Sequence, residues 1–91
     1  MRFDKQVFYF NEKKEPLGWK LGSMNDLGAE KQKELFSAAS TQANLKERHV
    51  VVATDQPLTI RSGFLKINDQ AFTILKVIGS TAYAGEYRGR L

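Results

Sequence analysis

The chain of 91 residues contains no cysteine, one histidine and two prolines. Without cysteine, neither a disulfide framework nor a thiolate metal site can form. His49 alone cannot build a histidine-based zinc site. No apolar run approaches the roughly 20 residues of a membrane-spanning helix, and the charged, strand-like start Met1–Phe10 does not resemble a signal peptide. We therefore expect one domain over residues 1–91 with a modest core, and no cofactor, metal or membrane partner.

The excess of positive over negative charge is also small. Lysine and arginine number 14 against 10 acidic residues, which gives a net charge of +4. A mild excess of this size is compatible with nucleic acid nearby, but it is also common on ordinary soluble surfaces. The composition therefore does not by itself select a nucleic-acid-binding function.

What the sequence does contain is a series of short apolar stretches with the alternation of β-strands. Turn residues separate them, and the clearest local pattern is a hairpin across Asn68-Asp69-Gln70. The predicted strands are Phe3–Phe10, Leu17–Ser23, Arg48–Thr54, Phe64–Ile67, Phe72–Ile78 and Ala82–Arg88, and Leu58–Ile60 is either a short strand or an extended loop. Gly18 and Gly22 leave space for a close neighbour on one face of the second strand.

One stretch, Asn25–Ser40, has a helical pattern instead. Wound at 100° per residue, Leu27–Ser40 places leucine, phenylalanine and alanine on one half of the circle and charged residues on the other. Asp26 is the expected N-cap. The order of elements predicts a mainly β fold: a small antiparallel barrel or sandwich of five to six strands, with one helix inserted after the second strand.

Catalytic patterns are weak. His49 precedes a run of three valines, so a structural role at a strand end is favoured over a Ser–His–Asp site, for which no motif is present. Glu30 and Glu34 share a helix face and could bind Mg²⁺, but Lys33 beside them favours a solvated or ion-paired face. We expect no enzymatic activity and no catalytic residues.

The aromatic residues allow two interpretations. Phe8, Phe10, Trp19, Tyr83 and Tyr87 could stack on bases while Lys66, Arg88 and Arg90 contact phosphates, as in single-strand-binding barrels. A barrel this small needs most of its aromatics for its own core. A core role is therefore the favoured interpretation.

The order of elements resembles the head–tail joining proteins of tailed phages, also called head-closure or stopper proteins. Three segments carry the resemblance: the helix start Met24–Phe36 (MNDLGAEKQKELF), the hairpin Phe64–Ile74 (FLKINDQAFTI) and the final strand Tyr83–Arg88. Together they place nearly the whole chain in the layout of two strands, helix, return strand and hairpin. The hairpin turn departs from the pattern by having no glycine.

The resemblance implies a structural virion protein at the head–tail interface, present in the host cytoplasm during assembly. It would form a ring of six or twelve copies, with the portal or adaptor above and the tail-terminator protein below. Packaged double-stranded DNA would pass through the lumen without sequence-specific contacts. The candidate channel and partner loops, Thr41–Glu47 and Asp55–Gly63, carry or adjoin Lys46, Arg48, Asp55, Arg61 and Lys66. We expect at least one of these loops to become ordered only on assembly.

Two alternatives remain. A tail-completion or tail-terminator ring protein would share the barrel and helix. A small nucleic-acid-binding barrel would instead show strong, salt-dependent binding.

Overall fold

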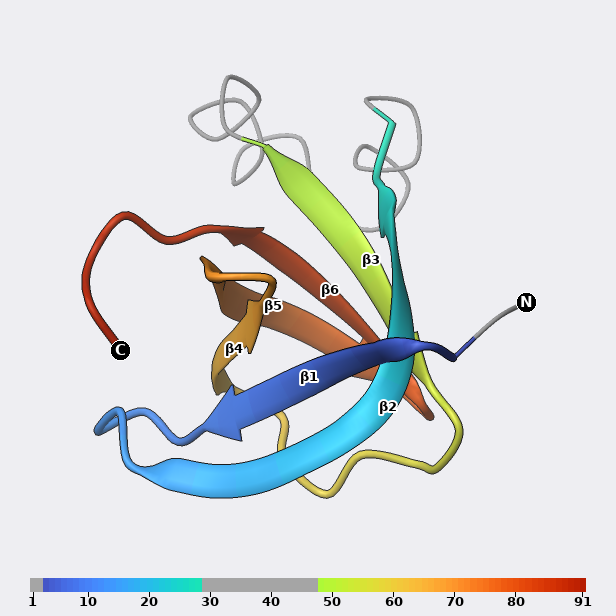
Figure 1. The fold of residues 1–91 in the computed structure, drawn as a ribbon, viewed down its shortest axis with the longest axis horizontal. Helices are drawn as coiled ribbons and strands as arrows, with labels where there is room; N and C mark the ends of the chain where they lie inside the picture. The colour runs from blue at the N-terminus through green and yellow to red at the C-terminus, as the bar shows by residue number, and fades with distance from the viewer. Residues whose placement is uncertain (1–2, 29–47) are drawn as a thin grey trace.

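Six antiparallel strands make up the part of the chain that the computed structural model describes, residues 3–28 and 48–91 (Figure 1). The strands are β1 (Lys5–Phe10), β2 (Pro16–Asp26), β3 (His49–Thr54), β4 (Gly63–Ile67), β5 (Gln70–Ile78) and β6 (Thr81–Glu86). They pair in the order β1-β2-β3-β6-β5-β4, and β4 pairs with β1 to close the barrel. The predicted antiparallel barrel is confirmed, and each of its six strands has a paired neighbour on both sides.

The predicted helix is not confirmed. β2 continues through Asp26, so Asn25 and Asp26 belong to a strand. Leu27 extends this pairing, because its backbone N–H donates to the His49 carbonyl at 2.9 Å. Leu27 and Gly28 have no helical structure, and the remainder of the predicted helix lies outside the described residues. Pairing with β3 explains the difference, since it satisfies the backbone groups of Met24, Asn25 and Asp26 in a strand.

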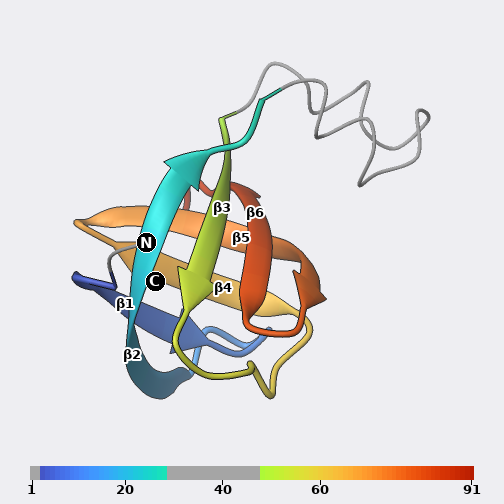
Figure 2. The ribbon, with the colours of Figure 1, turned by 90° about the vertical axis from the view of Figure 1, so that its right-hand side faces the viewer.

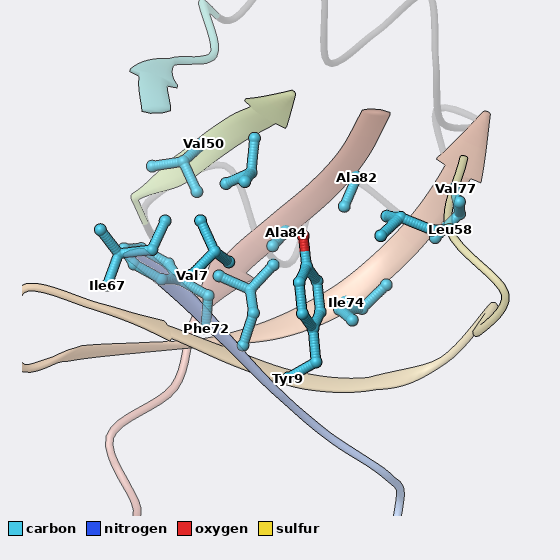
Figure 3. Close-up of a cluster of buried hydrophobic side chains, with 12 residues drawn as sticks. Val7, Tyr9, Val50, Leu58, Ile67, Phe72, Ile74, Val77, Ala82 and Ala84 are labelled. Atoms are coloured by element: carbon cyan, nitrogen blue, oxygen red, sulfur yellow. The ribbon is translucent and has the colours of Figure 1, made fainter. Parts of the chain in front are cut away.

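Alternation along each strand directs one set of side chains into the barrel, as expected for a period of two. In β1, Val7 and Tyr9 point inward, while in β3 Val50 and Val52 do so. Figure 3 shows how these side chains meet from all sides of the barrel. The buried core consists of Val7, Tyr9, Val50, Val52, Leu58, Leu65, Ile67, Phe72, Ile74, Val77, Ala82 and Ala84.

Close packing around the core depends on two glycines. A Cβ at Gly22 would lie 2.6 Å from the Ala53 carbonyl oxygen and 3.1 Å from Val7, which confirms the space predicted at this position. Gly63 has a φ of +119°, and a Cβ there would overlap the Phe10 carbonyl oxygen. These positions let β2 approach β3 and let β4 close onto β1.

The predicted hairpin between β4 and β5 turns through Asn68 and Asp69, both with positive φ (49° and 66°). Two left-handed residues in a two-residue loop match the right-handed twist of the flanking strands. Asparagine and aspartate tolerate this conformation better than most residues. The missing glycine is therefore compatible with a tight hairpin.

The barrel has two different ends. At one end, which we call the insert end, β2 and β3 reach beyond the other strands toward residues 28 and 48 (Figure 2). At the opposite end, which we call the loop end, the segment between β3 and β4 folds across the opening. Leu58 from this segment is buried, and its N–H donates to the Gly79 carbonyl in the β5–β6 turn. Leu58–Ile60 is thus a loop that seals the barrel.

Candidate functional site

The outer wall formed by β1 and β2 carries a group of large apolar side chains. Phe8 pairs with Trp19 across the two strands, and Gln6 pairs with Leu21 in the next outward row. Because directly opposed residues of an antiparallel pair share one face, these side chains lie together on the outside. We call Phe8, Phe10, Leu17, Trp19 and Leu21 the aromatic face.

Four members of the aromatic face are exposed to a degree that is unusual for their size. Trp19 is 53% exposed, Leu17 49%, Leu21 45% and Phe8 38%. The prediction that these aromatic residues serve mainly the core was therefore wrong, because Phe8 and Trp19 are exposed. The other three are half-buried outside the core: Phe10, Tyr83 and Tyr87. The aromatic core consists instead of Tyr9 and Phe72. Contiguous exposed apolar groups of this kind mark interaction surfaces.

A second aromatic cluster borders the aromatic face on the β4 side. The Phe64 and Tyr87 rings lie 4.7 Å apart between centroids, tilted by 48°. The Lys14 ammonium lies 5.2 Å from the centre of the Tyr87 ring. Phe64 pairs with Phe10, and Lys66 pairs with Phe8. The cluster holds the C-terminal segment beside the aromatic face. Lys66 is a cation next to the aromatic face.

A pocket of about 360 Å³ opens where the aromatic face reaches the loop end. Its walls are Leu17, Trp19 and Lys20 from β2, and Leu58, Thr59 and Ile60 from the sealing loop, with Tyr9 and Gly18 completing it. Gly18 has a φ of +115°, and a Cβ built there would meet no other atom within 4 Å. The absent side chain leaves part of the pocket open.

The opposite wall of the barrel, formed by β3, β6 and β5, has its own apolar group. Leu75 is 42% exposed and Ile78 50% exposed, with the half-buried Val51 and Tyr83 on the same outer wall. A register shift between Ile74 and Lys76 makes Leu75 an extra residue in β5. Such a bulge re-aims side chains, and here it leaves both Leu75 and Lys76 outside while Val77 returns to the core. We call Val51, Leu75, Ile78 and Tyr83 the aliphatic face.

The structure separates the charged residues that the sequence grouped into candidate loops. Arg48 lies at the insert end, where it donates to Asp26 at 3.1 Å and to Gln70 at 3.0 Å. Asp55 and Arg61 lie in the loop at the opposite end, and Arg61 donates to the Val77 carbonyl at 3.2 Å. Lys66 is on the outer wall of β4, and Lys46 lies outside the described residues. They do not form one site.

The buried polar groups show no catalytic arrangement within the described ranges. His49 is buried next to Gly85 and Leu75, and residues 3–28 and 48–91 contain no group of three or more potential metal ligands. Burial raises the pKa of Tyr9 to about 12, an effect that the neighbouring Thr54 hydroxyl partly offsets. The Thr54 hydroxyl donates toward the carbonyls of Gln56 and Ser80. The Tyr9 hydroxyl itself makes no hydrogen bond of ordinary geometry with the described residues.

Sequence reasoning missed Leu75, Ile78 and the pocket at Gly18. Strand alternation groups Leu17, Trp19 and Leu21 on one face of β2, but it does not say whether that face is inside or outside. Gly22 is the signal that could have decided this, because a Cβ on this inward residue would lie against Val7 and the Ala53 carbonyl oxygen, so the interior has no room for a side chain there. The bulge at Leu75 has no comparable signal.

No family model, curated protein or solved structure matches this chain. Within the described residues there is also no helix long and apolar enough to cross a membrane. The candidate site is therefore defined by its geometry alone: two separate apolar faces on opposite walls of a closed barrel.

Proposed function

We propose that this protein is a ring subunit at the head–tail connector of a tailed phage or prophage, where it closes the DNA-filled head and docks the tail. The observation that carries the proposal is the pair of exposed apolar faces on opposite walls of the barrel. A subunit inside a ring needs two different surfaces, one for each neighbour. The order of elements adds the specific resemblance to head-closure proteins.

The closed barrel supports association through side chains rather than strand pairing. Each strand of the described barrel has a paired neighbour on both sides, so no strand is free to pair with a neighbouring copy along its whole length. Each copy would therefore contact its neighbours with the aromatic and aliphatic faces, and the insert and loop ends would remain for the proteins above and below.

The test is electron microscopy of particles produced without this gene. We expect tailless heads, many of them empty of DNA, beside normal free tails. Abnormally long or malformed tails with full heads would assign the protein to the alternative role of a tail-completion or terminator ring. Normal virions would refute both structural roles.

A second candidate, a nucleic-acid-binding barrel, is favoured by one observation. The exposed Phe8–Trp19 pair with Lys66 beside it has the composition of a base-stacking platform. This function predicts submicromolar binding of a labelled single-stranded oligonucleotide, weakened strongly between about 50 and 200 mM salt. Trp19→Ala should then abolish binding, whereas Ile78→Ala on the opposite wall should not. Binding that is weak and equal in both variants would leave the ring function as the better account.

A further inference from the structure

We propose that Leu75 and Ile78 of one copy insert into the pocket beside Trp19 of the next copy, so that the ring contact joins two different surfaces of the same chain. This inference rests on the proposed ring function and names the partner surface for it. The occupant of the pocket is thus a second copy of this chain. The contact would be repeated between every pair of neighbours.

Shape supports this pairing. The pocket of about 360 Å³ has room for an aliphatic side chain, and Gly18 keeps part of it open. On the opposite wall, the β-bulge leaves Leu75 outside as an extra residue, and Ile78 is half exposed near the end of the same strand. One wall therefore offers a hollow and the other offers projections. An apolar projection that fits a pocket elsewhere on the same molecule produces a head-to-tail contact.

The positions of the two surfaces allow each copy to contact two neighbours. β2, which carries Leu17 and Trp19, and β5, which carries Leu75 and Ile78, lie three places apart in the closed order of six strands, and so on opposite walls. The pocket and Ile78 both lie toward the loop end, whereas Leu75 lies beside Gly85 and His49, nearer the insert end. The pocket includes Leu58, whose N–H donates to Gly79, the residue after Ile78. A head-to-tail contact between such surfaces closes into a ring when the rotation from copy to copy divides the full circle, and otherwise makes an open filament.

The size of the aromatic face is sufficient for such a contact. With about 150–250 Å² for a fully buried aromatic side chain, the exposed parts of Trp19 (53%) and Phe8 (38%) contribute roughly 200 Å² together. One side of a standard interface covers about 800 Å², of which a little over half is apolar. Leu17 and Leu21 are exposed to a similar degree. The aromatic face therefore supplies a large share of the apolar area that one partner needs.

Charge makes pairing of two aromatic faces less favourable. Such a symmetric contact would bring Lys66 of each copy to the same buried patch, and like charges at an interface oppose association. In the head-to-tail contact, Leu75 and Ile78 approach the pocket at the loop end. Lys66 pairs with Phe8 and Ala71, away from the pocket and nearer the insert end. The head-to-tail contact keeps Lys66 out of the buried patch, although it brings Lys20 of the pocket wall near Lys76 beside Leu75.

The absence of native cysteine allows a cross-linking test without background. We would prepare Leu17→Cys, Ile78→Cys and the double variant, and treat each at about 1 mM protein with a short bismaleimide. We expect the mixture of the two single variants to yield a dimer containing one of each. The double variant should yield a ladder of oligomers, and each single variant alone should stay monomeric. Arg88→Cys, exposed at the insert end, replaces Ile78→Cys in the control mixture and should give no dimer.

Several outcomes would overturn the contact. Dimers of Leu17→Cys alone would show that two aromatic faces pair symmetrically. Equal cross-linking with Arg88→Cys would show that the reaction is not specific, and a double variant that stays monomeric would exclude the contact. Leu75→Asp provides a second readout, because a charge in the pocket should weaken self-association at least tenfold in analytical ultracentrifugation, and an unchanged association would refute the proposal. The gene-deletion experiment involves no contact surface, so failure of the contact and failure of the ring function are distinguishable.

Discussion

Replacing Tyr9 by phenylalanine tests the account of the barrel core most directly. The Tyr9 side chain is 4% exposed, and its hydroxyl points among apolar side chains (Figure 3). Since this hydroxyl makes no hydrogen bond of ordinary geometry with the described residues, its burial costs free energy without compensation. We expect Tyr9→Phe at pH 7 to leave the free energy of unfolding unchanged or to raise it by up to about 1 kcal/mol.

The pH dependence of the free energy of unfolding gives the size and the direction of the effect of burying Tyr9. In the folded state the pKa of Tyr9 is raised from 10.0 to about 12 by burial. Between these values the unfolded chain has lost the phenolic proton while the folded chain keeps it, so stability falls as pH rises. The effect is absent below about pH 9 and reaches about 2.3 kcal/mol at pH 12. Tyr9→Phe should lack this part of the loss.

The assay is urea denaturation followed by circular dichroism at pH 7, 9, 10, 11 and 11.5. Other groups titrate in both proteins, so the difference between wild type and Tyr9→Phe isolates this one side chain. Tyr87→Phe, which removes a hydroxyl from a half-buried tyrosine outside the core, is the matched control. The reasoning fails if Tyr9→Phe loses as much stability at high pH as the wild type. It also fails if the variant loses more than about 1 kcal/mol at pH 7, because that would reveal a hydrogen bond to the hydroxyl.

Three further predictions concern the barrel itself and are measured by the same denaturation assay. Leu58→Ala should lower the free energy of unfolding by about 2–5 kcal/mol because it opens the sealed end. Leu17→Ala, at an exposed position, should change the free energy of unfolding by less than about 0.5 kcal/mol. Equal effects of the two substitutions would contradict the sealing role of the loop. Gly63→Ala should cost about 3 kcal/mol or more, through its positive φ and its overlap with Phe10. Gly28→Ala, where a Cβ meets nothing within 4 Å, is the control and should stay near wild type. Arg48→Met should cost no more than about 1 kcal/mol and lose that effect in 1 M salt, because its ion pair with Asp26 is solvent-accessible.

The strands could be predicted from sequence because their signals are local. Alternation in β1 and β3 and the turn at Asn68-Asp69 each fix an element from a few adjacent residues. The boundary at Asp26 could not be found this way. The predicted helix overlaps Asn25, Asp26 and Leu27, whose backbone groups bond to β3 instead. Because β3 lies more than twenty positions further along the chain, no local pattern reveals this pairing.

The candidate site was harder to predict for a related reason. Whether Trp19 faces the core or the outside depends on the register between β1 and β2, because a shift of one residue exchanges the two faces. The loop charges Asp55 and Arg61 were grouped with Arg48 by their place in the sequence, yet the barrel puts them at opposite ends. The bulge that leaves Leu75 on the outside depends on pairing between β5 and β6, which no local pattern encodes.

The stem formed by the ends of β2 and β3 has a consequence for how this protein can change. Leu27 donates to the His49 carbonyl, and Arg48 bonds to Asp26, so residues 28 and 48 are held close to each other by the barrel's own pairing. The entropy of closing a connection grows only slowly with its length. The segment between them can therefore be shortened, lengthened or exchanged at small cost to the barrel. In evolution, and in engineering, this is the position where the chain can acquire a new partner without redesigning its fold.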